Sequence, residues 1–85
     1  MGTEISNIAV FERILLILHV ININPIATID TVSLQALPEL TSRSAQRYIK
    51  HLEEAGYVKA IGSMPKRLFL TEKTKAIFRV DNEII

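Results

Sequence analysis

The sequence predicts an α+β fold, and three observations indicate it. The chain has 85 residues, of which 48% are hydrophobic and 22% charged, which suits one compact domain spanning residues 1–85 and leaves no room for a second. Apolar residues recur at helical spacing in two long segments, and two short β-branched and aromatic runs lie between residues 57 and 70. The chain has no cysteine, so neither disulfides nor thiolate metal ligands are expected to hold its core together.

The first predicted helix spans residues 9–21, where ten of thirteen residues are apolar. At 100° per residue, seven of them fall within about 160° of arc and are expected to face the core: Val10, Phe11, Ile14, Leu15, Ile17, Leu18 and Ile21. Leu16 and Val20 lie outside this arc and are candidates for a homodimer contact, although exposed apolar residues are also normal on a monomer. Asn24 precedes Pro25, and this pair is expected to end the helix.

A short extended segment and a short helix are predicted next. Residues 26–32 are rich in β-branched side chains, which favours a strand or an extended connection. Asp30 or Ser33 can cap a helix through Leu34–Leu37, and Pro38 should end it because proline has no backbone N–H.

A longer helix is predicted to begin after Thr41, a favourable N-cap, and to run to about Ala55. Gly56 follows where a left-handed C-cap is common. One face carries the apolar stripe Ala45, Tyr48, Ile49 and Leu52. The opposite face, within about 100° of arc, is mainly cationic: Arg43, Gln46, Arg47, Lys50 and Glu54.

Residues 57–61 and 68–70 are predicted to form a β-hairpin whose basic tip carries Lys66 and Arg67. Thr71 can cap a final helix that begins at Glu72.

Charge is unevenly distributed along the chain, although the net charge is only +1. Residues 1–40 carry a net charge of −3, whereas residues 41–75 carry +5. A basic segment on a nearly neutral chain indicates a local site for an anionic partner, most commonly nucleic acid. A solvated lysine-rich surface is the alternative.

Membrane and enzyme functions are not expected. The uncharged segment Ile14–Ile29 is too short and too polar to span a bilayer, and the N-terminus lacks the basic leader of a signal peptide, which favours a cytoplasmic protein. His19 and His51 lie on different predicted helices, so neither a catalytic pair nor a metal site is indicated. No phosphate-binding glycine motif is present. We therefore expect no metal, cofactor or small-molecule effector.

The order of these elements is that of a helix-turn-helix followed by a wing. Residues 41–49, TSRSAQRYI, carry a capping threonine, then serine, alanine, arginine and an aromatic-aliphatic pair. Leu52, Gly56, Tyr57 and Val58 complete a Leu-x-x-x-Gly-aromatic-Val pattern. This combination resembles winged helix-turn-helix DNA-binding proteins of the MarR, IclR and Fur-like kinds.

The hairpin extends the resemblance. Residues 67–73, RLFLTEK, resemble the return strand and following helix cap of these regulators, but Thr74 stands where they often have glycine. The resemblance covers roughly residues 30–78. It implies an α+β winged helix-turn-helix with a three-helix core, a β-hairpin wing and a C-terminal helix. The helix-turn-helix would span about 30–56 and the wing about 57–71.

The cationic helix carries the residue types that contact bases. An α-helix fits the major groove of B-DNA, where arginine can bridge O6 and N7 of guanine and glutamine can pair with adenine. Arg43, Gln46 and Arg47 are therefore predicted to contact bases, and Ser42 lies beside them.

Further residues are predicted to contact phosphates. Lys50, one turn further along the helix, and Lys66 and Arg67 in the wing would set affinity and its salt dependence. The hydroxyls of Thr41 and Ser44 could also bind phosphate at the helix N-terminus, or could serve only as a cap and as a contact to the preceding helix.

The sequence thus predicts a protein that binds double-stranded DNA in a sequence-specific way. It would be a small transcriptional regulator that acts by occupying promoters. Homodimers are expected because one recognition helix covers only a few base pairs, and the candidate contacts are Leu16, Val20, Ile84 and Ile85. Two alternatives remain open. One is a winged helix that docks on another protein, and the other is an origin-binding or accessory replication factor of a plasmid, virus or other mobile element.

Overall fold

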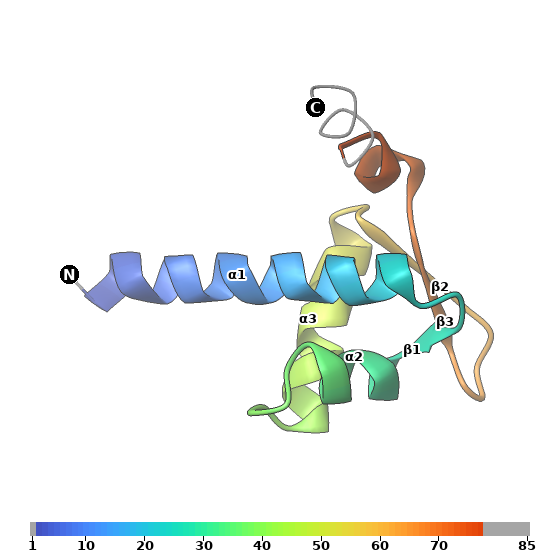
Figure 1. Ribbon diagram of the computed structural model, residues 1–85, viewed down its shortest axis with the longest axis horizontal. Coiled ribbons are helices and arrows are strands. Elements are labelled where there is room, and N and C mark those ends of the chain that lie inside the picture. Colours follow the sequence, from blue (N-terminus) through green and yellow to red (C-terminus); the bar gives the residue numbers. More distant parts are fainter. Residues whose placement is uncertain (1, 78–85) are drawn as a thin grey trace.

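The computed structural model describes residues 2–77, and Figure 1 shows how their elements are arranged. The elements in chain order are α1 (Gly2–Ile23), β1 (Ala27–Thr28), α2 (Ile29–Gln35), α3 (Ser42–Glu54), β2 (Val58–Ile61) and β3 (Arg67–Leu70). Residues 72–77 are also helical. This is the mixed α+β arrangement that the sequence predicts. Two of the predicted dimer contacts, Ile84 and Ile85, lie outside the described residues.

Within the part of the chain that the structure describes, the sheet has three strands in the order β1-β3-β2, and both pairs are antiparallel. The predicted hairpin is confirmed, with Val58 opposite Leu70 and Ile61 opposite Arg67. The short strand β1 pairs with the other side of β3. Because side chains alternate along a strand, Leu68 and Leu70 are buried while Arg67 points to solvent.

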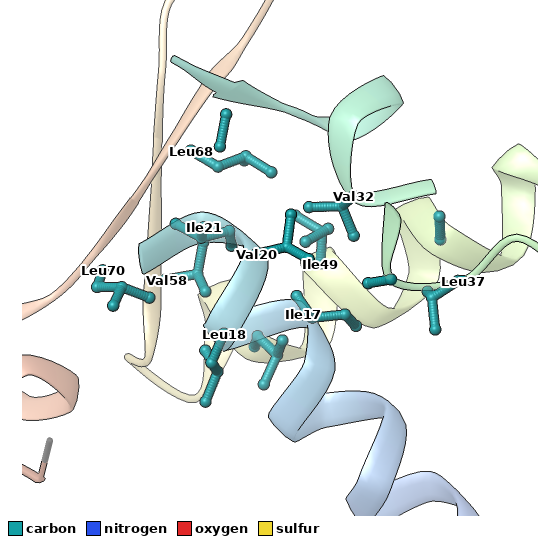
Figure 2. Close-up of a cluster of buried hydrophobic side chains, with 14 residues drawn as sticks. Ile17, Leu18, Val20, Ile21, Val32, Leu37, Ile49, Val58, Leu68 and Leu70 are labelled. Carbon is teal, nitrogen blue, oxygen red and sulfur yellow. The ribbon is translucent and has the colours of Figure 1, made fainter. Parts of the chain in front are cut away.

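The core lies between the sheet and the helices α1, α2 and α3, as Figure 2 shows. Ile17 of α1, Val32 of α2 and Val58 of β2 are almost completely buried in it, together with Leu37 from the connection after α2. Side chains of this size each stabilise a fold by about 1.5–3 kcal/mol when they leave water. The packing of these elements on one another holds the surface of α3 in a defined orientation.

The first helix is longer than predicted, and only its C-terminal half is covered. Ile17, Leu18 and Ile21 are buried as predicted, but Val10, Phe11 and Leu15 of the same predicted face are exposed. Figure 1 shows the reason, since the N-terminal half of α1 extends past the other elements. Within residues 2–77, no helix has the combined length and hydrophobicity that crossing a membrane requires.

Val20 was predicted as a surface contact of a dimer, and this is wrong. Its side chain is only 4% exposed and belongs to the core cluster, because α2 and the sheet cover more of the circumference of α1 than one apolar arc suggests. Leu16, the other member of the predicted stripe, is 47% exposed and remains available to a partner.

The helix α2 begins earlier than predicted and ends as expected before Pro38. Its N-cap is Thr28, not Asp30 or Ser33. The Thr28 hydroxyl accepts a hydrogen bond from the Thr31 N–H at 3.3 Å, and the Thr31 hydroxyl accepts one from the Thr28 N–H at 3.2 Å. This reciprocal box satisfies two backbone donors at once, which a single carboxylate or hydroxyl would not.

Both predicted ends of α3 are confirmed. The Thr41 hydroxyl accepts a hydrogen bond from the Ser44 N–H at 3.2 Å. At the other end, Gly56 adopts a positive φ of 86°, the left-handed conformation that favours glycine. The Tyr57 N–H donates to the Leu52 carbonyl at 2.9 Å, so the chain closes the helix and turns directly into the hairpin.

The helical residues 72–77 are joined to the end of α3 by hydrogen bonds. The hydroxyl of Thr71 donates to the Gly56 carbonyl at 2.6 Å. Thr74, which replaces the glycine common in the regulators that this sequence resembles, is 1% exposed and donates to the Tyr57 carbonyl at 2.8 Å. Lys73 Nζ donates to the Ala55 carbonyl at 3.2 Å. A threonine at position 74 therefore adds a bond to the junction.

Candidate nucleic-acid interface

The polar face of α3 is open to solvent. Arg43, Gln46, Arg47 and Lys50 are all exposed, and they lie opposite the buried residues of the same helix. Among the side chains that the structure describes, those of residues 7–77, no ion pair engages the three cations of this face. Their charges are therefore available to an anionic partner. Ser42, at the first turn of α3, is exposed beside them.

The two hydroxyls at the start of α3 are hydrogen-bonded to each other. Thr41 Oγ1 donates to Ser44 Oγ at 3.2 Å while it caps the helix. Thr41 is exposed and Ser44 is half-buried. Of the two roles expected for Thr41, capping of the helix and phosphate binding, the structure contains the cap.

A hollow of about 610 Å³ separates α3 from the wing. Gln46 and Lys50 line it from α3, and Ser63 and Lys66 line it from the turn between β2 and β3. The wing therefore lies beside the predicted base-contacting face, with one lysine on each side of the hollow. Acidic groups are also present, since Asp30 and Glu53 contribute to its lining.

A second hollow, of about 380 Å³, lies on the other flank of α3, toward α1. Its cationic and polar lining combines residues of both helices: Arg13 of α1 with Ser44, Arg47, Tyr48 and His51. The Arg13 guanidinium donates to the Tyr48 hydroxyl at 3.3 Å, and this bond raises the pKa of Arg13 further above its already high ordinary value. Arg13 is therefore a permanent positive charge on this flank.

Arg13 and His51 did not appear among the residues predicted for this surface. His51 lies one turn after Arg47 on the same helix, and this spacing was the available signal. Residues 1–40 contain one arginine, Arg13, and no lysine, but nothing in the sequence indicates that α1 passes beside α3.

The wing carries positive charge and has no acidic residue within its own segment of sequence. Lys66 and Arg67 are exposed, as predicted. Between Glu54 and Glu72 the chain contains no aspartate or glutamate. Among the described side chains of residues 7–77, no group of three or more histidine, aspartate or glutamate residues is placed to hold a metal ion.

Two solved structures resemble this chain. The transcriptional regulator SlyA matches with a TM-score of 0.64 and 25% sequence identity, covering 84% of this chain and 51% of its own. The diamide-treated YodB of B. subtilis matches with a TM-score of 0.60 and 25% identity, covering 81% of this chain and 70% of its own. This chain therefore spans about half the length of SlyA.

No protein-family model matches the sequence, and no curated protein matches it significantly. The structural matches and the order of the elements nevertheless agree with the resemblance of residues 30–78 to winged helix-turn-helix regulators. The chain has the winged helix-turn-helix fold of DNA-binding transcriptional regulators.

Proposed function

We propose that this protein binds double-stranded DNA in a sequence-specific way and regulates transcription by occupying promoters. The observation that carries the proposal is the uncovered cationic face of α3, flanked by one hollow on each side. A helix lying in the major groove has a sugar-phosphate backbone on each of its flanks. Both hollows supply room where those backbones would pass, and the hollow toward α1 is lined by Arg13 and Arg47 with no acidic residue.

Within this complex, Arg43, Gln46 and Arg47 contact base edges. They project from the first turns of α3, the part of a recognition helix that penetrates the groove most deeply. Arginine can form two hydrogen bonds with guanine, and glutamine can form two with adenine, so each side chain discriminates against the other bases.

Phosphates bind on the two flanks. On one side Lys50 and Lys66 face the hollow from the helix and from the wing. On the other side Arg13 and His51 extend the surface toward α1. Such contacts are independent of sequence and release counterions, so they set the salt dependence of binding.

The functional unit is proposed to be a homodimer that contacts DNA twice. One recognition helix covers only a few base pairs, and two copies on neighbouring half-sites raise specificity to a useful level. The exposed apolar side chains on the protruding half of α1, among them Phe11, Leu15 and Leu16, are the candidate contact. A cytoplasmic location accompanies this proposal.

The first experiment is selection from a random duplex pool at about 50 and 200 mM salt, followed by sequencing of the bound fraction. Several phosphate contacts should lower affinity by orders of magnitude across this range. Enrichment of an inverted repeat supports a dimeric DNA-binding protein. The genomic position of that repeat, in a promoter or at a replication origin, then separates the regulator from a replication factor. No binding at 50 mM salt contradicts the proposal and favours a winged helix that docks on protein.

A further inference from the structure

The face of the sheet that points away from the core carries apolar side chains. An antiparallel sheet with one face on a core usually has a polar opposite face. Here Phe69 of β3 is 36% exposed and Ile61 of β2 is 51% exposed. Ile26, directly before β1, is 61% exposed. Because Ala27 lies opposite Leu68, the same register brings Ile26 beside Phe69. Three apolar side chains therefore share this face.

Two cations lie among these apolar side chains. Lys59 is opposite Phe69 in the ladder, and Arg67 is opposite Ile61, so each pair combines an apolar side chain with a positive charge. Among the described side chains of residues 7–77, no ion pair engages either cation. No acid occurs in residues 55–71. The chemistry of the surface is thus complementary to apolar groups flanked by carboxylates. Five residues form this outer sheet face: Ile26, Lys59, Ile61, Arg67 and Phe69.

The outer sheet face is directed away from the hollow between α3 and the wing. Ala60 and Leu68 line that hollow. Successive side chains of a strand point to opposite faces, so the neighbours of these two residues along β2 and β3 point the other way. The core side chains of α1, α2 and α3 also pack on the inner side of the sheet. A duplex seated on α3 and in this hollow would therefore leave the outer sheet face uncovered.

We propose that the outer sheet face binds an acidic amphipathic helix of another protein, a second partner beside DNA. Neighbouring strands lie about 4.8 Å apart, so three strands match the diameter of about 10 Å of an α-helix. The apolar stripe of this helix covers Ile26, Ile61 and Phe69. Carboxylates at the borders of the stripe pair with Lys59 and Arg67, and the arginine can bind one of them through two hydrogen bonds.

Other occupants suit this surface less well. Single-stranded nucleic acid stacks its bases on several aromatic side chains, and Phe69 is the one aromatic residue of the outer sheet face. Binding to an anionic bilayer typically takes about 4–8 clustered basic residues, whereas this face has Lys59 and Arg67. Two copies of the same face would oppose like charges. A protein segment that brings both carboxylates and apolar side chains satisfies all five residues.

Two synthetic peptides of about 18 residues, long enough to form a helix, test the proposal. Both carry leucine at every third or fourth position, and the flanking positions are glutamate in one peptide and lysine in the other. Each is titrated into the isotope-labelled full chain, and amide signals are followed by nuclear magnetic resonance. The glutamate peptide should shift the signals of the outer sheet face. The lysine peptide should bind at least about tenfold more weakly, because like charges repel.

Substitutions on the outer sheet face supply the second readout. Phe69→Ser and Ile61→Ser should each weaken binding of the glutamate peptide about tenfold. Ile61 is half exposed, so its variant remains informative if Phe69→Ser does not fold. Arg67→Glu should favour the lysine peptide over the glutamate peptide. Leu34→Ser is the matched control and should bind as the wild type does, because it removes an apolar side chain that is 76% exposed on α2.

Competition with the selected duplex separates this surface from the DNA-binding one. The glutamate peptide should bind the protein-DNA complex as tightly as the free protein, and Phe69→Ser should bind the duplex as the wild type does. Displacement of the peptide by DNA would place the peptide on α3 and overturn the proposal. Peptide binding at the outer sheet face by a chain that binds no duplex would support the proposal and overturn only the DNA-binding function.

Three further results would overturn the proposal. The first is that neither peptide binds, or that both bind equally well. The second is that vesicles of phosphatidylglycerol, in place of the glutamate peptide, shift the signals of the outer sheet face. The third is that the wild type self-associates and Phe69→Ser abolishes this, which would make a second copy of the chain the occupant.

Discussion

Two arginines on successive turns of α3 are expected to carry most of the sequence preference. Arg43→Ala and Arg47→Ala should each cost on the order of 1–3 kcal/mol in specific binding, because each removes a two-bond contact to a base. Titration of the selected site and of its single-position variants checks this. Each variant should lose its preference at one position of the site. Selectivity that survives both changes would exclude these residues from base contacts.

Lys66 is proposed to contact phosphate and not a base. Lys66→Ala should weaken binding to all sequences about equally and lower the slope of log affinity against log salt by about one, since one phosphate contact disappears. Titrations at four or five salt concentrations measure this slope. Lys75→Ala is a suitable control because Lys75 lies in the helical residues 72–77, where it pairs with Glu72 at 3.7 Å. An unchanged slope for Lys66→Ala would remove the wing from the phosphate contacts.

The exposure of individual side chains could be predicted from the sequence where it depends only on position around one helix. The exposed positions of Arg43, Arg47 and Lys50 follow from helical periodicity alone. Arg13 could not be found in this way, because its hydrogen bond to Tyr48 joins residues 35 positions apart. The burial of Val20 likewise depends on which elements cover α1.

At the scale of elements, caps and breakers set most boundaries. Thr41 and Gly56 mark the two ends of α3. The Thr41 hydroxyl can accept a hydrogen bond from a helix N–H, and Gly56 tolerates a positive φ. The start of α2 was misplaced because three neighbouring residues could cap it. Thr28 does so because it alone combines with Thr31 in a reciprocal box.

The end of α3 offers a test of stability. Gly56→Ala should lower the free energy of unfolding by about 1–2 kcal/mol, because alanine disfavours the left-handed conformation. No atom lies within 4 Å of the added Cβ, so crowding contributes nothing and the backbone conformation is the whole cause. Urea denaturation measures the loss. Gly56→Asn should recover part of it, since asparagine tolerates this conformation. Equal losses for both variants would contradict the conformational explanation.

At the scale of the whole molecule, the exposed half of α1 is the proposed contact between two copies of the chain. Leu16→Glu should weaken self-association at least about tenfold, because the contact would then bury an unpaired carboxylate. Sedimentation equilibrium measures the change. Binding to the inverted repeat should fall more than binding to a single half-site.

A matched substitution on another surface controls for added charge. Leu34→Glu places a carboxylate on α2 at a side chain that is 76% exposed, and self-association should be unchanged. A wild-type protein that stays monomeric at high concentration would contradict the homodimer. A dimer insensitive to Leu16→Glu would instead place the contact elsewhere.

The sequence by itself determined the order of elements, the cationic face of α3 and the basic wing, because periodicity, caps and turn residues act within a few positions along the chain. Only the tertiary structure decided which part of α1 is buried, that Arg13 joins the flank of α3, and that Lys66 of the wing faces Lys50 of α3 across a hollow. These depend on contacts between residues far apart in sequence, and packing between elements determines them.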